Sequence, residues 1–267
     1  MRLLLNLEAL NDQQVWNPSE YHKVQGFVYD KLIANTEFKE IHNLKSYKFF
    51  CFSNIFPPSI VKKGQIKNLL ICSPNEDLIK SIFSYIKNNI LHDKVVNIGE
   101  QQYYIKSLEL LEAKIIDDSC VLRTSTPVSI RIPEKAYSIY KIHNEDRKKK
   151  FLYWRSNLSP DIFLALVLNN SRSKYSQFYK QDITNNNIQS IIQSIVLLKE
   201  IVIHIPIDAY TIKLPASFWR FHFTNLNNES KKFINFMLDT GIGERNSTGL
   251  GFLNVEEGAR ISRLIII

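Results

Sequence analysis

The chain has 267 residues, of which 45% are hydrophobic and 22% charged, which is ordinary for a globular protein of one large or two smaller domains. Lysine and arginine outnumber aspartate and glutamate by 34 to 26, and the resulting charge of +8 favours polyanionic partners. No apolar stretch approaches the roughly 20 residues of a transmembrane helix, and no signal peptide is visible, so we expect a cytoplasmic protein without membrane contact. Cys51, Cys72 and Cys120 are odd in number and widely spaced, which argues against a disulfide framework.

The first 115 residues predict the element order β-α-β-β-α-β. Leu-rich sequence at 1–7 is typical of a strand, and Asn17-Pro18 can cap and begin a helix that continues to about Ala34. Ser73-Pro74-Asn75 opens a second helix, to about Leu91, with apolar residues at helical spacing. Further strands are predicted at 45–56, 66–72, 95–98 and 103–112. This order is that of the ferredoxin-like split βαβ motif.

The rest of the chain repeats the same order with longer connections. We predict strands at 120–132, 200–207, 210–214, 218–224 and 251–255, and helices at 159–169 and 229–238. The fold class is therefore α+β, with tandem ferredoxin-like (RRM-like) βαββαβ domains at 1–115 and 116–267. The apolar end at 265–267 has no assigned role.

A glycine-rich stretch lies near the end of the chain. Four of the eight glycines, Gly241, Gly243, Gly249 and Gly251, fall within 11 residues. Glycine tolerates positive φ and close backbone approach, so we expect a loop whose exposed N–H groups bind phosphate, with Arg245 adding a guanidinium. The spacing fits neither a P-loop nor a dinucleotide-binding fingerprint. RNA is therefore the expected ligand.

Three segments together resemble the repeat-associated mysterious protein superfamily, in particular the CRISPR-associated endoribonucleases that process precursor guide RNA. The stretch 241–251 resembles the family's signature G-loop. Residues 21–29 resemble its first helix, in which His and Gln-Gly precede an apolar pair and Tyr. Thr126-Pro127-Val128 resembles the turn that opens the second half. The resemblance implies tandem ferredoxin-like domains.

The resemblance also implies the chemistry and the residues that carry it. Family members cut repeat RNA without a metal: the 2′-hydroxyl attacks the neighbouring phosphate and leaves a 2′,3′-cyclic phosphate and a 5′-hydroxyl. The family's catalytic Tyr, His and Lys correspond to Tyr29, His42 and Lys48. Histidine suits proton transfer near neutral pH, and lysine suits a point charge on the phosphate. Read singly, each residue would be an ordinary surface or core-edge side chain.

Several other residues are candidates for RNA contact. His22 shares a helix face with Tyr29 and is the alternative to His42, which we favour for proton transfer. The basic run 147–150, followed by aromatic residues, fits either a nucleic-acid contact or a solvated turn. Closer to the glycines in sequence, the further candidates are Lys231, Lys232 and Arg220.

The sequence therefore predicts a metal-independent endoribonuclease of CRISPR RNA maturation with neither metal nor cofactor. Its predicted partner is CRISPR repeat RNA, or precursor crRNA. Subunits of a CRISPR effector complex and a second copy of the chain are the further partners considered. The alternative is a non-catalytic RNA-binding subunit of an effector complex. A generic paired RNA-binding module is less favoured, because 47–52 carries no clean RNA-recognition signature.

Overall fold

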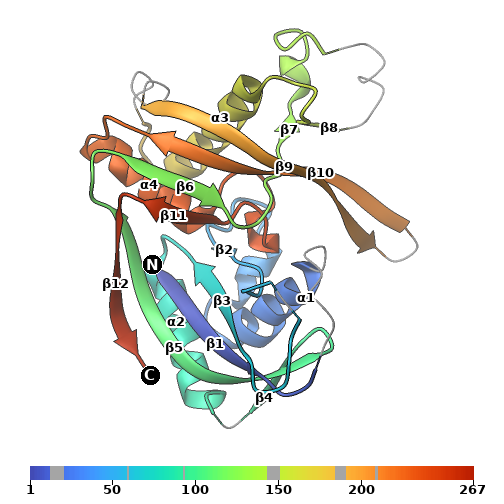
Figure 1. The fold of residues 1–267 in the computed structure, drawn as a ribbon, viewed down its shortest axis with the longest axis vertical. Helices are drawn as coiled ribbons and strands as arrows, with labels where there is room; N and C mark the ends of the chain where they lie inside the picture. The colour runs from blue at the N-terminus through green and yellow to red at the C-terminus, as the bar shows by residue number, and fades with distance from the viewer. Residues whose placement is uncertain (13–20, 59, 93, 143–150, 184–190, 208–209) are drawn as a thin grey trace.

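The computed structural model describes residues 1–267 except 13–20, 59, 93, 143–150, 184–190 and 208–209. Two antiparallel sheets stand one above the other, each with two helices (Figure 1). No described helix is long and apolar enough to cross a bilayer. The first sheet has the order β12-β5-β1-β3-β2, with β4 paired to β5, and contains β1 (Arg2–Ala9), β2 (Cys51–Phe52), β3 (Ile66–Cys72), β4 (Val95–Ile98), β5 (Gln101–Ile115) and β12 (Ala259–Ile266).

The second sheet has the order β11-β6-β10-β9, and a separate small sheet pairs β7 with β8. These strands are β6 (Cys120–Thr124), β7 (Arg131–Ile132), β8 (Leu152–Tyr153), β9 (Ile192–Ile207), β10 (Tyr210–Phe223) and β11 (Leu253–Glu257). The α-helices are α1 (Tyr21–Gly26), α2 (Glu76–Asn89), α3 (Pro160–Tyr179) and α4 (Asn228–Thr240).

Both sheets confirm the tandem ferredoxin-like prediction. The four central strands of the first unit have the order β5-β1-β3-β2, and β4 only extends the sheet beside β5. The four strands of the second unit have the equivalent order, β11-β6-β10-β9. All of these pairs are antiparallel. This is the arrangement that two interlocked split βαβ units produce.

The core of the first unit agrees closely with the predicted pattern of apolar residues. Leu3, Leu5 and Leu7 alternate along β1 and are fully buried, because successive side chains of a strand point to opposite faces. Helix α2 begins where predicted: the Asn75 side chain accepts hydrogen bonds from the backbone N–H groups of Asp77 and Leu78. The helix predicted before residue 34 continues from α1 into a wide π-helical turn over Phe27–Leu32. Its predicted cap, Asn17-Pro18, lies outside the described residues.

The strand predicted at 45–56 is wrong for most of its length. Only Cys51–Phe52 pair in the sheet, with a single bridge from Phe56 to Asn68. Residues 45–50 form a bend and an irregular loop that pairs with no described strand. Phe49 even takes a positive φ of 49°. This departure from the sheet leaves the segment that contains His42 and Lys48 outside regular structure.

The second unit is built from longer elements than predicted. Helix α3 continues to Tyr179 rather than ending near Asn169, and Lys180 then adopts a left-handed conformation. The three strands predicted between 200 and 224 are two long strands, β9 and β10, joined as a hairpin. Pro215 lies in the part of β10 that pairs with β9. The pairing of β10 with β6 comes later in the strand, at Arg220–Phe223. Proline is tolerated at such an edge position.

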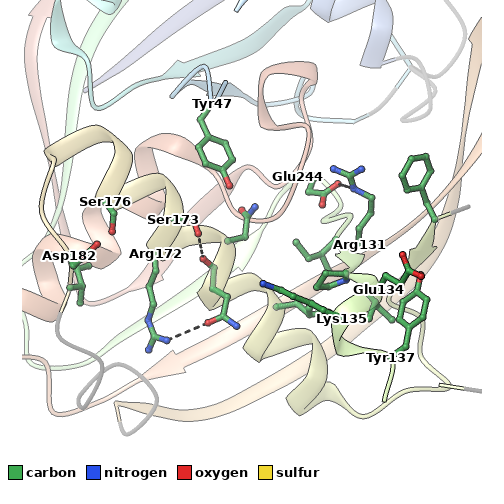
Figure 2. A pocket seen from close by; sticks show the side chains of 18 residues that line it. Tyr47, Arg131, Glu134, Lys135, Tyr137, Arg172, Ser173, Ser176, Asp182 and Glu244 are labelled. Atoms are coloured by element: carbon green, nitrogen blue, oxygen red, sulfur yellow. Dashed lines mark hydrogen bonds and ion pairs between the residues drawn. The ribbon is translucent and has the colours of Figure 1, made fainter. Parts of the chain in front are cut away.

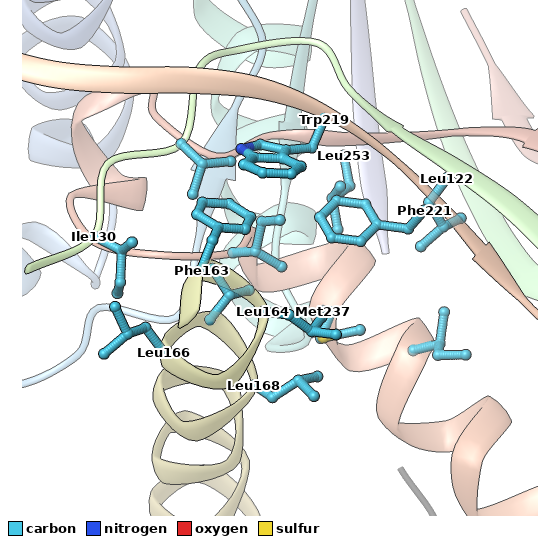
Figure 3. Packing of buried hydrophobic residues seen from close by; sticks show 14 of the residues in the cluster. Leu122, Ile130, Phe163, Leu164, Leu166, Leu168, Trp219, Phe221, Met237 and Leu253 are labelled. Atoms are coloured by element: carbon cyan, nitrogen blue, oxygen red, sulfur yellow. The ribbon is translucent and has the colours of Figure 1, made fainter. Parts of the chain in front are cut away.

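Aromatic packing holds the second unit together (Figure 3). Trp219 of β10 is fully buried and stacks on Phe163 of α3, with ring centroids 4.0 Å apart. Met237 and Phe233 of α4 belong to the same core. The helices α3 and α4 are thereby fixed against the sheet.

The last strand, β12, returns to the first sheet and pairs with β5 (Figure 1). The apolar end of the chain is therefore a sheet edge. The sequence predicts that the second unit includes all of residues 116–267. We propose instead that the second unit spans about 116–258 and that residues 259–267 belong to the first unit.

Candidate active site

Tyr29 lies in the π-helical turn after α1, and its ring is the centre of a small cluster. The side chain is 5% exposed, and its ring packs edge-on against Phe50 at 5.5 Å between centroids. On the other side, the ring of His42 meets it edge-on at 4.9 Å. Wide π turns are frequent at functional sites because they re-aim one side chain of a helix.

His42 lies in the last turn of a 3-10 helix at Lys39–Asn43, and Lys48 lies in the irregular chain that follows it, so we refer to residues 42–48 as one segment. His42 is exposed, whereas Lys48 is partly buried. The Lys48 ammonium donates a 2.7 Å hydrogen bond to the backbone carbonyl of His42 and lies 5.2 Å from the centroid of the Tyr29 ring. The three residues implied by the resemblance therefore lie together.

Burial changes the acid–base properties of two members of the cluster. It raises the pKa of Tyr29, and a hydrogen bond with Ser247 opposes part of that rise. The phenol therefore stays protonated at neutral pH and serves as a hydrogen-bonding group, not as a base. Burial also lowers the pKa of Lys48. A partly desolvated ammonium interacts more strongly with a nearby anion than one in bulk water.

Ser247 belongs to the G-loop, residues 241–251, which comes after the C-terminus of α4. The hydrogen bond to Tyr29 and the packing of the loop against β2 join the two units at this point. An added Cβ at Gly249 would lie 2.6 Å from the Phe52 ring, so only glycine allows the loop to approach β2 this closely.

The expectation that the glycines present exposed N–H groups is wrong. Gly241, Gly243, Gly249 and Gly251 are all buried. Their backbone donors are largely used inside the protein: the N–H of Gly251 donates to Pro127 O at 2.9 Å, and that of Gly249 donates to Asn246 O at 2.9 Å. The positive φ of these residues serves close packing of the loop on itself and on the turn at 127–129. The parts of the loop that reach the surface are the side chains between the glycine pairs.

Lys174 of α3 organises the interior of the G-loop, and no sequence motif indicates this role. The ammonium is buried and donates to Gly241 O at 3.1 Å, to Gly243 O at 2.8 Å and to the side-chain oxygen of Asn246. The Asn246 amide in turn donates to the carbonyls of Ile242 and Leu250. Burial lowers the pKa of Lys174 to about 7. Lys174 thus fixes the beginning and the middle of the loop to α3, and Asn246 ties the end of the loop to its beginning.

Arg245 is the exposed residue of the G-loop and takes a left-handed conformation with φ of 58°. It borders two depressions. One, of about 340 Å³, is the central hollow, whose walls include Lys48 and Ser247. The other is a cleft of about 60 Å³, where Arg245 and Thr248 lie opposite His22 of α1. His22 therefore lies across the loop from Lys48 and not in the Tyr29–His42 contact.

The remaining candidates lie elsewhere. Lys231 and Lys232 stand at the opposite end of α4 from the G-loop, roughly 14 Å along the helix. Their closeness in sequence is therefore not closeness in space. Lys231 donates to the Ile116 carbonyl, and Lys232 lies over the Tyr179 ring at 4.6 Å. Arg220 forms an ion pair with Glu256 on the second sheet. The basic run 147–150 lies outside the described residues.

Comparison with known proteins agrees with this architecture. The family model described as "CRISPR associated protein Cas6, C-terminal" matches residues 110–255. The chain is 29% identical over 258 residues to the CRISPR-associated endoribonuclease Cas6 2 of Methanocaldococcus jannaschii, covering 95% of this chain and 99% of the relative. It is 28% identical over 262 residues to the CRISPR-associated endoribonuclease Cas6 of Haloferax mediterranei, covering 96% and 94% of the two chains.

The fold has solved counterparts as well. A structure described as an RAMP protein binding different RNA substrates superposes with a TM-score of 0.67 at 19% identity, over 96% of this chain and all of the other. At that identity the match establishes the shared fold. The sequence matches, in contrast, extend over nearly the whole of both relatives.

Proposed function

The chain belongs to the Cas6 family of CRISPR-associated proteins, and on that premise we propose that it is a metal-independent endoribonuclease that cuts CRISPR repeat RNA in precursor crRNA. The observation that carries the proposal is the convergence of Tyr29, His42 and Lys48 beside the G-loop. The relatives from Methanocaldococcus jannaschii and Haloferax mediterranei are both endoribonucleases by name.

In the proposed reaction the ribose 2′-oxygen attacks the adjacent phosphorus, and the bond from phosphorus to the 5′-oxygen breaks. The 2′-hydroxyl gives up a proton and the 5′-oxygen gains one, so the products are a 2′,3′-cyclic phosphate and a 5′-hydroxyl. His42 is the proton-transfer residue, since imidazole exchanges protons near neutral pH and this side chain is exposed to solvent.

Lys48 supplies positive charge where the phosphate gains negative charge. Its partial burial supports this role, because an electrostatic contact removed from bulk water stabilises a transition state more strongly. Its hydrogen bond to the His42 carbonyl also fixes the position of the imidazole. Tyr29 is a positioning residue: its ring supports both partners, and its hydroxyl reaches Ser247.

The G-loop is proposed to place the RNA, and Arg245 with its neighbours Ser247 and Thr248 are its contact groups. A guanidinium can bind phosphate through two parallel hydrogen bonds. Arg245 lies at the border of the central hollow and the His22 cleft, so a phosphate bound there would have Lys48 on one side and His22 on the other.

The test is single-turnover cleavage of a repeat RNA in EDTA, with identification of both product ends. We expect full activity, a 2′,3′-cyclic phosphate and a 5′-hydroxyl, and no cutting of RNA with a 2′-deoxyribose at the cleavage site. A requirement for divalent metal, or a 3′-hydroxyl product, would contradict the mechanism. Tight RNA binding without any cutting would favour the alternative, a non-catalytic subunit of a CRISPR effector complex.

A further inference from the structure

A second and larger depression adjoins the central hollow (Figure 2). This α3 groove has a volume of about 1260 Å³ and lies between helix α3 and the segment around β7, with Tyr47 above it. Small-molecule sites typically measure roughly 300–1,000 Å³. The groove is therefore larger than a small-molecule site needs and suits a segment of a polymer.

The α3 groove is continuous with the central hollow. Tyr47, Arg131, Asn170 and Glu244 line both depressions. Tyr47 directly precedes Lys48, so their Cα atoms are about 3.8 Å apart. A polynucleotide with one phosphate at Lys48 would therefore have its neighbouring nucleotides at Tyr47 and the mouth of the groove.

The groove is close to electrically neutral. Among the described residues that line it, three are basic, Arg131, Lys135 and Arg172, and three are acidic, Glu134, Asp182 and Glu244. Arg131 and Glu244 form an ion pair at 2.7 Å. A surface with balanced charges attracts phosphates only weakly. In the α3 groove, contacts to RNA bases are therefore favoured over contacts to the RNA backbone.

Two buried polar atoms in the groove wall lack a protein partner among the described residues: Asn170 Oδ1 and Arg172 Nε. These two atoms are inaccessible, and the remaining polar atoms of the Asn170 amide and the Arg172 guanidinium are the groups with which the two residues line the groove. Their neighbours on the same helix, Ser173 and Ser176, are small and polar and leave room above them. An amide and a guanidinium can recognise the hydrogen-bonding edges of bases.

Aromatic rings border the same space. Tyr47 lies above the groove (Figure 2), and Phe151, which also lines it, is half exposed, with the Arg131 guanidinium 5.3 Å from its ring centroid. Unpaired bases stack on such rings, and sequence-specific recognition of RNA mostly uses unpaired nucleotides. We propose that the α3 groove binds unpaired nucleotides adjacent to the cleaved phosphate and reads at least one base through Asn170 and Arg172.

This inference rests on the proposed function, so its test measures binding and does not depend on cleavage. The probe is a repeat RNA blocked by 2′-deoxyribose at the cleavage site, with each flanking base changed in turn, and its Kd is measured by fluorescence anisotropy. We compare wild type with Asn170→Ala, Arg172→Gln and Tyr47→Leu. Asn89→Ala and Tyr85→Leu on α2 are the matched controls, and thermal melting establishes that each variant is folded.

Wild type should lose about 10-fold in affinity when one particular flanking base is changed, as expected for a paired hydrogen-bond contact. Asn170→Ala and Arg172→Gln should each remove that preference without changing the salt dependence of Kd, because no phosphate contact is lost. Tyr47→Leu should weaken binding about 10-fold for all flanking bases. The controls should bind like wild type.

The inference is overturned if the folded variants keep the affinity and base preference of wild type. It is equally overturned if removal of the nucleotides next to the cleavage site leaves the affinity unchanged, because the groove would then hold no part of the RNA. If the variants behave as expected but unblocked RNA is not cut, the proposed function fails and the groove assignment stands. If wild type binds no repeat RNA, both fail.

Discussion

The segment 42–48 and the G-loop border the same central hollow but are built in opposite ways. His42 is exposed, and a hydrogen bond from the Lys48 ammonium to the His42 carbonyl joins the two ends of the segment. The G-loop has four buried glycines and a buried lysine that bonds three of its oxygens. The difference fits the proposed separation of chemistry from RNA placement: substitutions in the first region should cost little stability, and substitutions of the buried residues in the second should cost much.

The two regions can be told apart by substitutions that should affect stability in one and reaction rate in the other. Replacement of a buried glycine of the G-loop should act through the fold. Replacement of His42 or Lys48 should act through the reaction and leave unfolding unchanged.

The largest effect on stability is expected for Gly251→Ala. The added Cβ would overlap the Ile242 carbonyl oxygen at a φ of 72°, so both sterics and backbone conformation oppose it. We expect a loss of about 4 kcal/mol in unfolding free energy, measured by urea denaturation. Gly64→Ala is the control, since Gly64 has a φ of 80° with open space around it and should cost only about 1 kcal/mol. Equal costs at the two positions would contradict the packing role of the loop.

Lys48→Met should reduce the single-turnover rate by about 100-fold, as removal of a transition-state electrostatic contact typically does. The unfolding free energy should change by less than about 1 kcal/mol, because the side chain is only partly buried. Lys45→Met, an exposed lysine of the same segment, is the control and should cut at the wild-type rate. If both variants lose activity equally, general charge and not the position of Lys48 matters.

Lys174 should make the stability of the G-loop depend on pH. The pKa of Lys174 is about 7 in the folded protein against an ordinary 10.5, so between pH 7 and pH 9 the unfolded chain binds more protons there. Stability from this group therefore rises with pH, by about 2 kcal/mol over that range. Relative to Lys174→Met, wild type should gain that amount in urea unfolding between the two pH values. A difference independent of pH would refute the assignment.

Hydrophobic periodicity and capping predict most of the regular elements from the sequence. Leu3, Leu5 and Leu7 mark β1, and Asn75 marks the beginning of α2, because burial and capping are local signals. The cluster of Tyr29, His42 and Lys48 is predicted instead by the resemblance. No local pattern indicates that an exposed histidine and a strand-like lysine will meet one tyrosine.

The wrong predictions concern segments that lie beside the candidate active site. The second half of α3 is not predicted because Ser171 and Lys174 occupy buried positions, which interrupts the apolar period of the helix. Exposed donors are wrongly expected in the G-loop because the spacing of glycines does not reveal which carbonyls they will face. Local rules are broken most often where a structure carries function, and here both departures meet at Lys174.

The most direct test of the division between chemistry and placement is His42→Ala, with cleavage rate and RNA affinity measured on the same preparation. We predict a loss of at least about 100-fold in the single-turnover rate in EDTA, with Kd for blocked repeat RNA within about threefold of wild type. Undiminished cutting by His42→Ala would contradict this division, because the proton transfer would then lie elsewhere. A parallel collapse of binding would show that His42 places the RNA as well.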